Sequence, residues 1–423
     1  MLAGLNVKHI INYNKIADGG KRELSLLKYV NRQNTDCEKW DGLNAKYGRD
    51  DLLPMWVADM DFQSPDCVIE AVKEYAEKGV FGYYSIPDAY YDAFISWERE
   101  HFNFDLEQEW IRHSPGVVAG INWILQIVTE PGDAVIILSP VYYPFKNAIV
   151  NNNRKPIECD LINENGKYSI NFIEFEEAIV RENVKCFILC SPHNPVSRVW
   201  TESELESLLD ICRRHGVFVI SDEIHQDFVF GPNKQIPSFT VGDTGCYDDM
   251  MIALTAPSKT FNLAGMMHSI VIIPDEKLRT EWDRYTEQIR VMWGNNLGYI
   301  ATRAAYESGA LWLEELKEQI YGNYLYLKNA LKSEFEDVVI SELEGTYLMW
   351  IDIGAYVSAE NMRSFAEDKC RLAVDYGEWF GGTGNDTHIR LNLATSAEIV
   401  EEAADRLLKG LREVITRRKS RES

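Results

Sequence analysis

Lys259 is the residue whose type and position most directly suggest covalent chemistry. It follows the apolar run 250–254, which has the length and composition of a fully buried strand. A lysine just beyond such a strand lies near the carboxyl edge of the sheet, where open α/β folds bind their ligands. Its amine can act as a nucleophile and form a Schiff base with a carbonyl group. A single loop lysine is more often a solvated surface residue, so other parts of the chain have to decide between the two interpretations.

Polar or aromatic side chains also follow three other predicted strands. They are Tyr142 after residues 134–138, Asn194 after residues 186–190 and Asp222 after residues 217–221. Each alone has an ordinary explanation, because an asparagine before proline favours a turn and an acid at a strand end can cap a loop. It is much less probable that all four residues, including the lysine, follow predicted strands for such independent local reasons. We therefore expect all four side chains to converge at one edge of the sheet.

These four side chains match what a protein must provide for pyridoxal 5'-phosphate (PLP). The lysine would bind the aldehyde, and Asp222 would keep the ring nitrogen protonated. Asn194 would bond the phenolic oxygen, Tyr142 would stack on the ring, and backbone amides of the helix start 117–120 would bind the phosphate. His225 is placed to orient the phenolic oxygen or the carboxylate, or else to serve as a hydrogen-bonded core histidine.

The composition narrows the classes of function. The 423 residues carry a formal net charge of −23, which disfavours nucleic acid because phosphate binding needs clustered lysine and arginine. We interpret the basic run 417–421 as a solvated helix end. The eight cysteines have no CxxC spacing and no HExxH motif occurs, so we expect reduced thiols and no metal site. No apolar run approaches the ~20 residues of a membrane span, and no signal peptide is recognisable, which favours a cytoplasmic protein.

The elements that must position the four side chains alternate between strands and helices, which indicates a parallel sheet. Further predicted elements are a helix from Pro65 to Gly79 with Ser64 as its N-cap, a helix 88–102, a helix that opens within 113–120 and runs to about 130, a helix from Thr201 to Gly216 that begins with a capping box to Glu204, and a strand 269–273.

The two ends of the chain have different patterns. Residues 1–50 are polar and irregular, and we interpret them as an arm or an early helix belonging to the smaller domain. Residues 51–290 form the predicted large domain, and residues 291–423 a long linking helix and a smaller α+β domain. The predicted elements past residue 275 are helices 276–290, 296–306 and 311–332, a strand 345–353, a helix from Ser358, a glycine turn 381–384, a strand 388–393 and a closing helix from Ser396.

Several segments together resemble a known enzyme family. They are residues 55–62 (MWVADMDF), 81–83 (FGY), 191–196 (SPHNPV), 221–225 (SDEIH), 256–262 (APSKTFN) and 389–392 (IRLN). From about residue 30 onward the chain resembles fold-type I PLP enzymes of the aspartate-aminotransferase superfamily, and the first segment resembles their cystathionine β-lyase or C–S lyase branch (MalY/PatB type). The resemblance implies an α/β fold. Its large PLP-binding domain has a mainly parallel seven-stranded sheet sandwiched by helices, and its smaller α+β domain is built from both ends of the chain.

The resemblance also implies roles for residues near the cofactor phosphate. Val118 and Ala119 would bind the phosphate through their backbone amides, and Ser258 would add its hydroxyl. Tyr83 would reach the cofactor phosphate of the neighbouring subunit. The active unit would therefore be a homodimer with shared active sites.

Further implied roles concern the substrate. Arg390 would clamp the substrate α-carboxylate in a bidentate way, Ala58 would contact the substrate, and Tyr143 would assist near the leaving group. One departure from the family pattern is Ser197, where glycine is usual after the Asn-Pro-Val run. A loop that needs a positive φ at this position would be strained by serine.

The reaction implied by the resemblance is β-elimination from an amino-acid thioether. The chain would cleave L-cystathionine or a related cysteine thioether to a thiol, pyruvate and ammonia, and Lys259 would remove the Cα proton. One alternative is a PLP-dependent aminotransferase, which reprotonates the substrate at a different position. A second alternative is a PLP-binding regulatory protein that acts through a protein partner. The sequence leaves these alternatives open.

Overall fold

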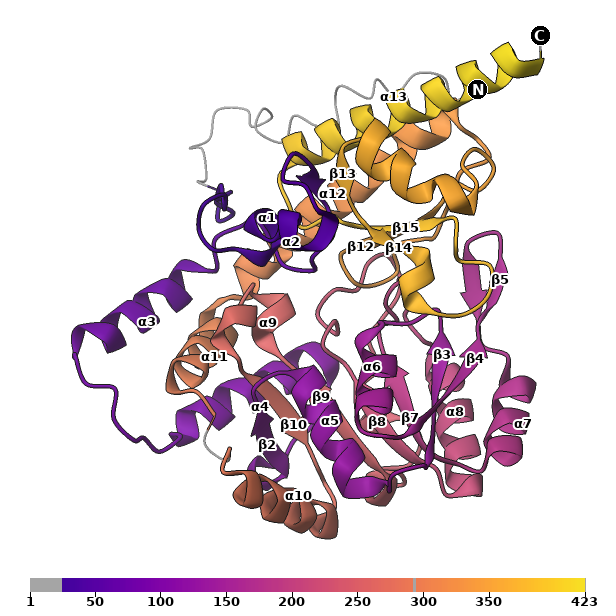
Figure 1. Ribbon diagram of the computed structural model, residues 1–423. Coiled ribbons are helices and arrows are strands. Elements are labelled where there is room, and N and C mark those ends of the chain that lie inside the picture. Colours follow the sequence, from indigo (N-terminus) through magenta and orange to yellow (C-terminus); the bar gives the residue numbers. More distant parts are fainter. Residues whose placement is uncertain (1–24, 292–293, 423) are drawn as a thin grey trace.

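The computed structural model describes residues 25–291 and 294–422, so the first part of the predicted N-terminal arm lies outside the described residues. The described part of the arm is mostly irregular and ends in two short helices, α1 (Glu38–Asp41) and α2 (Leu43–Tyr47). Figure 1 shows both helices beside the smaller, upper part of the molecule.

A seven-stranded sheet forms the centre of the larger, lower part of the molecule (Figure 1). Its strands lie in the order β2-β10-β9-β8-β7-β3-β4, and only β10 runs antiparallel to its neighbours. The expectation of a mainly parallel seven-stranded sheet is therefore confirmed. The strands are β2 (Ile111–Ser114), β3 (Ala134–Ser139), β4 (Lys155–Asp160), β7 (Val184–Cys190), β8 (Phe218–Asp222), β9 (Met251–Thr255) and β10 (Ser269–Ile272).

The two edge strands of this sheet differ from the sequence expectation. His113 and Ser114, expected to open a helix, pair instead with β10, and the helix begins only at Val117. No strand is expected at β4, which contains Pro156; an edge strand tolerates proline because one side of its backbone needs no partner. Both strands exist because of pairing with a distant segment, which a local pattern cannot reveal.

Helices cover both faces of the sheet, and the strands between them are buried on both sides (Figure 1). Alternate strand residues therefore enter different cores: Ile137 and Ile188 belong to one, Ile136 and Leu189 to the other. One face carries α5 (Val117–Val128), α6 (Pro144–Asn151) and α10 (Glu276–Ile289), and the other carries α4 (Asp88–Phe102), α7 (Phe172–Glu182), α8 (Glu202–His215) and α11 (Asn296–Ser308).

Helix starts show where local signals hold and where they fail. The capping box of α8 is confirmed, with Thr201 accepting from the backbone of Glu204 and the Glu204 carboxylate accepting in return. The prediction that Ser64 caps the helix after it is wrong. Helix α3 (Asp66–Glu77) has no side-chain cap, because the Ser64 hydroxyl donates to the backbone oxygen of Asn262 at 3.2 Å. A tertiary contact therefore replaces the local one.

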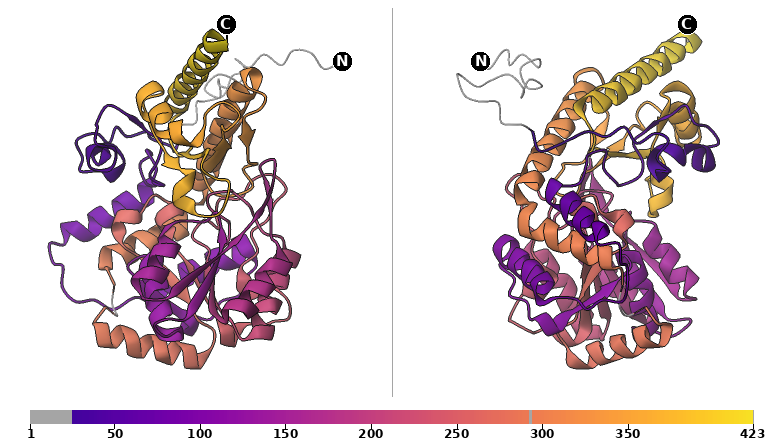
Figure 2. Two further views of the ribbon diagram at one scale, coloured as in Figure 1. Left: turned by 45° about the vertical axis from the view of Figure 1, so that its right-hand side comes forward. Right: turned by 90° about the vertical axis from the view of Figure 1, so that its left-hand side faces the viewer.

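The smaller part of the molecule contains a four-stranded antiparallel sheet in the order β11-β12-β15-β14. Figure 2 shows α12 extending from the larger part toward α13 at the top of the molecule. The helix expected from Ser358 is instead a 3-10 turn (Ala359–Asn361) followed by a π-helix (Ser364–Lys369). The remaining elements are β11 (Val339–Ile340), β12 (Leu348–Asp352), β14 (Asp375–Tyr376), β15 (His388–Asn392), α12 (Ala310–Glu334) and α13 (Ala397–Glu422).

Segments from both ends of the chain build this smaller part. Strand β1 (Leu53–Pro54) pairs in parallel with β13 (Leu372–Ala373). The backbone of Asn392 next donates to Met55 O at 2.8 Å, and the Asn392 side chain donates to Val57 O and Asp59 O at 2.6 Å each. The segment 53–59 is therefore held against the small sheet and faces the large one. Neither α12, α13 nor any other helix in the described part of the chain is suited by length and apolar character to cross a bilayer.

Candidate active site

The four strand-end residues expected to converge come from four adjacent strands. Lys259 follows β9, Asp222 ends β8, Asn194 follows β7 and Tyr142 follows β3, and these strands are neighbours in the order β9-β8-β7-β3. Backbone hydrogen bonds join their ends, since Ser191 N donates to Asp222 O at 2.9 Å and Tyr142 N donates to Asn194 O at 3.0 Å. The carboxyl edge of the sheet thus brings the predicted set together.

Lys259 sits in a single helical turn, α9 (Pro257–Thr260), that starts directly after β9. Its amine donates to Ala58 O at 2.5 Å, and the hydroxyl of Tyr347 donates to the same oxygen at 2.8 Å. Burial lowers the pKa of Lys259 to about 8, while the negative charges of Asp59 and Asp222 act in the opposite direction. At pH 7 roughly a tenth of the amine is therefore unprotonated, and about half is at pH 8; an amine nucleophile requires this unprotonated form.

Asp222 is a buried carboxylate without a cationic partner among the described residues. Its side chain accepts from the backbone N–H of Ile224 at 3.1 Å, and no described lysine or arginine lies within 4.0 Å of it. Burial raises the pKa of Asp222 to about 7, and the backbone N–H of Ile224 and the charge of Lys259 oppose this rise. A protonated ring nitrogen placed beside this carboxylate would supply the missing positive charge.

His225 is buried, and its Nδ1 has no hydrogen-bond partner among the described residues. Its ring packs edge-on against Tyr347, with 5.5 Å between ring centroids. Burial and the positive charges of Lys259 and Arg390 hold the pKa of His225 well below its ordinary value. The unpaired Nδ1 of this neutral imidazole is available to a polar group of a ligand.

Arg390 connects the small sheet to the strand-end residues of the large one. It lies on β15 and is buried, and one terminal nitrogen donates to Asn194 Oδ1 at 2.8 Å. The other terminal nitrogen forms an ion pair with Asp375 on β14. Its guanidinium carbon lies 4.9 Å from the ring centroid of Phe380, and its Nε has no partner among the described residues. A buried, unused N–H donor at this place suits a carboxylate ligand.

The other predicted cofactor residues surround this set. Val118 and Ala119 lie in the first turn of α5, where backbone N–H groups have no partner within the helix. Ser258 precedes Lys259 in α9. Tyr143 follows Tyr142, with 5.6 Å between their ring centroids, and it meets Phe380 edge-on at 5.9 Å.

Tyr83 is the predicted site residue that the structure leaves on the surface. It lies between α3 and α4, and its side chain is 98% exposed. The hydrophobic neighbours Val80 and Phe81 are 69% and 66% exposed. Within one chain, Tyr83 is therefore not brought to the lysine.

The loop after Asn194 does need a positive φ at Ser197. This residue has a φ of +62°, and its hydroxyl donates to Leu348 O at 2.6 Å. The left-handed conformation costs a non-glycine residue of order 1–3 kcal/mol, and a buried hydrogen bond offsets about 1 kcal/mol of such a cost. The loop therefore adopts a positive φ at this serine, and the serine hydroxyl fastens the loop to β12.

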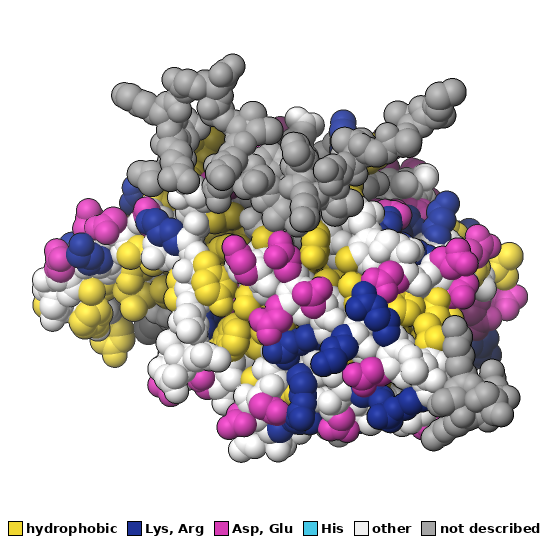
Figure 3. Space-filling view, turned by 90° about the horizontal axis from the view of Figure 1, so that it is seen from above, with side chains coloured by type: hydrophobic (Ala, Val, Ile, Leu, Met, Phe, Trp, Pro, Cys, Tyr) yellow, Lys and Arg dark blue, Asp and Glu magenta, His cyan; other side chains and the backbone are white. Residues whose placement is uncertain are grey.

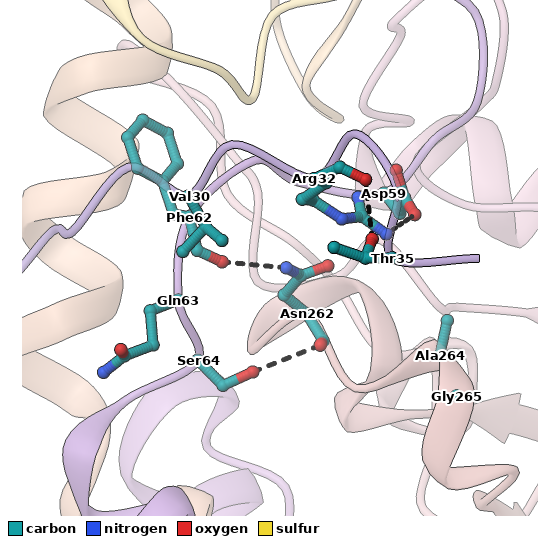
Figure 4. Close-up of a pocket in the computed structure, with 10 residues that line it drawn as sticks. All are labelled: Val30, Arg32, Thr35, Asp59, Phe62, Gln63, Ser64, Asn262, Ala264 and Gly265. Atoms are coloured by element: carbon teal, nitrogen blue, oxygen red, sulfur yellow. Dashed lines mark hydrogen bonds and ion pairs between the residues drawn. The ribbon is translucent and has the colours of Figure 1, made fainter. Parts of the chain in front are cut away.

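A cavity of about 350 Å³ lies beside the lysine turn, between the described end of the arm and residues 262–265 (Figure 4). Arg32 and Asp59 face one another across its upper wall at 2.8 Å. The second oxygen of Asp59 has no partner among the described residues. Asp59 lines this cavity and is also the charge that most strongly favours the protonated form of Lys259. The complete lining is Val30, Arg32, Thr35, Asp59, Phe62, Gln63, Ser64, Asn262, Ala264 and Gly265.

Three residues of the site were not indicated by the sequence. Asp59 stands inside the segment 55–62 and could have been suspected there. Tyr347 and Asp375 carry no local signal. Asp375 reaches the site through the pairing of β14 with β15, and Tyr347 lies directly before β12 and reaches Ala58 O with its hydroxyl.

The arrangement fits PLP. The Nδ1 of His225 has no partner and Asp222 has no cationic partner among the described residues, and the cofactor offers a phenolic oxygen and a protonated ring nitrogen. The amine of Lys259 is available for an aldehyde, and the start of α5 is available for a phosphate. No other cofactor chemistry is needed to account for these groups.

Comparisons with known proteins agree with this geometry. The family model for aminotransferase class I and II matches residues 50–407. Cystathionine beta-lyase PatB of Bacillus subtilis is 34% identical over 381 residues, covering 90% of this chain and 98% of that protein. Protein MalY of Escherichia coli is 30% identical over 395 residues, covering 92% and 98%.

Solved structures give the same picture. Cystalysin from Treponema denticola, which contains pyridoxal 5'-phosphate, has a TM-score of 0.87 and 33% identity, covering 92% of this chain and 99% of that one. A PLP-bound C-S lyase from Staphylococcus hominis has a TM-score of 0.85 and 32% identity, covering 91% and 97%.

Proposed function

Because the chain belongs to the aminotransferase class I and II family, we propose that it is a PLP-dependent carbon–sulfur β-lyase. It cleaves L-cystathionine or a related cysteine thioether to a thiol, pyruvate and ammonia. The similarity to PatB over nine-tenths of the chain supports this substrate class. The observation that carries the proposal is that Lys259, Asp222 and Asn194 converge at one edge of the large sheet and that Arg390 of the small sheet bonds to Asn194 there.

The residues around the cofactor have distinct tasks. When bound, PLP supplies an aldehyde that captures the substrate amino group and a ring that withdraws electrons from Cα. Lys259 holds the cofactor and then, with a pKa of about 8, takes the Cα proton on its amine. Asp222 keeps a positive charge at the ring nitrogen, and Tyr142 stacks on the ring. His225 and Asn194 orient the phenolic oxygen.

The phosphate and the substrate are bound by other groups. The backbone amides of Val118 and Ala119 and the hydroxyl of Ser258 bind the phosphate. Arg390 binds the substrate carboxylate through its unused N–H groups. Tyr143 lies near the leaving group. The segment that contains Ala58 closes the site above Lys259, and Tyr347 retains the Ala58 carbonyl when the lysine amine turns to the cofactor.

The active unit is a homodimer in this proposal, and Tyr83 completes the phosphate site of the other subunit. Its exposure and that of Val80 and Phe81 support this, because apolar side chains grouped on a surface mark an interface. Figure 3 shows hydrophobic side chains gathered at the left margin of the molecule, where α3 and the segment after it project. The eight cysteines are all unpaired thiols, which supports a reducing, cytoplasmic location.

A PLP-dependent aminotransferase is the second candidate. Aspartate aminotransferase of Pyrococcus horikoshii is 23% identical over 373 residues, covering 86% of this chain and 91% of that protein. Both reactions begin with loss of the Cα proton, so the proposed lysine serves either.

The two candidates are separated by a product assay. In a first assay, purified protein is given L-cystathionine without any 2-oxo acid, and thiol, pyruvate and ammonia are measured. We expect the three products in equal amounts. In a second assay a 2-oxo acid is added; transfer of the amino group to it, with no pyruvate released from cystathionine in the first assay, would contradict the lyase and support the aminotransferase.

A further inference from the structure

Asp375 is paired with the arginine that would bind the substrate carboxylate. It lies on β14 directly opposite Arg390 on β15 in the strand register, so the backbone itself sets the pair. Asp375 is 2% and Arg390 3% exposed, and a terminal nitrogen of the guanidinium donates to Asp375 Oδ2. Salt screens such a buried pair much less than a surface pair. The charge of Asp375 is therefore felt by any ligand of Arg390.

The guanidinium still has donors for a ligand. One of its five N–H groups is committed to Asn194 and one to Asp375, and a weak contact of 3.5 Å joins it to Trp56 O. The Nε–H has no partner among the described residues. Arg390 can therefore bind a carboxylate while it keeps its bond to Asp375.

The pair makes the carboxylate site close to neutral. The positive charge of Arg390 attracts a carboxylate, and the negative charge of Asp375 repels it from beyond the guanidinium. Lys46 of α2 also acts on Asp375, but it lies outside the ion pair. An unpaired buried arginine would attract every carboxylate strongly. The paired Arg390 contributes less electrostatic affinity for a ligand that carries net negative charge.

Amino acids and 2-oxo acids differ in that net charge. Both present an α-carboxylate to Arg390. An amino acid is a zwitterion, and its ammonium group offsets the repulsion from Asp375. A 2-oxo acid is a net anion without such an offset. The charge of Asp375 therefore weakens the binding of the 2-oxo acid more than that of the amino acid.

Resting on the proposed function, we propose that Asp375 is a specificity-determining residue that makes the Arg390 site select amino acids over 2-oxo acids. The 2-oxo acids are the amino-group acceptors of an aminotransferase, and pyruvate is a product of the lyase. The selection thus favours elimination over amino transfer and limits the occupation of the site by product. The test is a ratio of two affinities, which damage to the site as a whole does not move.

The experiment compares pyruvate with 2-aminoisobutyrate, an amino acid that has no Cα proton to lose. Their Kd values for the PLP-loaded protein are measured by calorimetry in the natural protein and in Asp375→Asn. Asparagine keeps an oxygen acceptor for Arg390 but no charge. We expect pyruvate to bind about tenfold more tightly, which is about 1.4 kcal/mol, while the Kd of 2-aminoisobutyrate changes less than about threefold. An unchanged ratio of the two Kd values overturns the proposal.

Two further variants make the result decisive. Asp352→Asn changes a carboxylate on the adjacent strand β12 that bonds Gly354 and Thr387 rather than the arginine, and it should leave the ratio unchanged. Asp375→Ala also removes the charge, without introducing an amide, and it should shift the ratio of the two Kd values in the same way. It replaces the asparagine variant if that variant does not fold. Failure of the proposed function is a separate outcome, seen when the natural protein binds both ligands but releases no pyruvate from L-cystathionine.

Discussion

At the scale of single residues, the environment of Lys259 prepares it for reaction. Burial is the largest influence on this amine, and it lowers the pKa from an ordinary 10.5 to about 8. Asp59 and Asp222 oppose burial, so the amine is neither permanently protonated nor permanently free. A base that takes and returns a proton works best with a pKa near the ambient pH.

This environment predicts the pH dependence of cofactor uptake. Only the unprotonated amine attacks an aldehyde, so the rate at which cofactor-free protein takes up PLP should rise with pH through a midpoint near 8. The rate is followed by the absorbance of the bound cofactor. Asp59→Asn should move the midpoint to lower pH, because Asp59 favours the protonated amine.

The exposed Asp66, which pairs with Lys28, provides the control, and Asp66→Asn should leave the midpoint unchanged. A midpoint near 10.5 in the natural protein would mean that the lysine behaves as a solvated side chain.

The sequence predicted the candidate site residues that directly follow or end their own strands. Lys259, Asp222 and Asn194 each follow an apolar run, so their position at a shared sheet edge could be inferred from the linear sequence alone. Asp375 and Tyr347 could not be found in this way. Their contacts depend on the register of the small sheet and on its placement against the large one.

At the scale of elements, the short turn α9 is held in place by the buried carboxylate of Asp227. The hydroxyl of Thr260 donates to Asp227 Oδ2 at 2.5 Å, and the indole of Trp97 on α4 donates to Asp227 Oδ1 at 3.0 Å. All three residues are buried. The turn that carries the lysine is therefore connected, through Asp227, to helix α4 on one face of the sheet.

Thr260→Val should weaken this attachment. It retains the shape of the side chain but leaves one oxygen of the buried carboxylate without its donor, at a cost of about 1–3 kcal/mol. We expect the free energy of unfolding, measured with urea, to fall by this amount and the affinity for PLP to fall with it.

Thr416→Val on the exposed face of α13 is the matched control, and it should change the stability by less than about 0.5 kcal/mol. Equal losses in the two variants would remove the special role of the contact between Thr260 and Asp227.

Elements with strong local signals were predictable and those made by pairing were not. The helix 88–102 and the capping box at Thr201 follow from periodicity and from side-chain type. The edge strand β4 and the π-helix 364–369 depend on tertiary contacts. Ser64 shows the same effect, because its hydroxyl is used by Asn262 rather than by its own helix.

At the scale of the whole molecule, the site is closed by two sheets that contribute opposite walls. The carboxyl edge of the large sheet carries Lys259, Asp222 and Asn194, the small sheet carries Arg390, and Tyr347 lies directly before its strand β12. The bond between Arg390 and Asn194 joins the walls directly. The division of the chain at residues 50 and 290 stays a prediction, although the pairing of β1 with β13 places residues just past 50 beside the C-terminal part.

The exposed segment before α4 predicts the state of assembly. Phe81→Asp places a charge in the proposed interface, and it should convert a dimer into a monomer in light-scattering measurements. The same variant should bind PLP more weakly, because Tyr83 no longer reaches its partner.

Ile173→Asp offers a control of equal chemistry, since Ile173 lies on α7 and is 73% exposed. It should remain a dimer. A natural protein that is already monomeric and fully loaded with cofactor would contradict a shared site.

Chemical trapping at Lys259 tests the central claim most directly. Borohydride fixes the bond between the cofactor aldehyde and the amine that holds it, and peptide mass mapping then locates the added mass. We predict that the mass appears on the peptide that contains Lys259 and on no other lysine. The label should be lost in Lys259→Ala, whose lyase activity should fall about 10³-fold. Labelling of a different lysine, or none in protein that still cleaves L-cystathionine, would contradict the account.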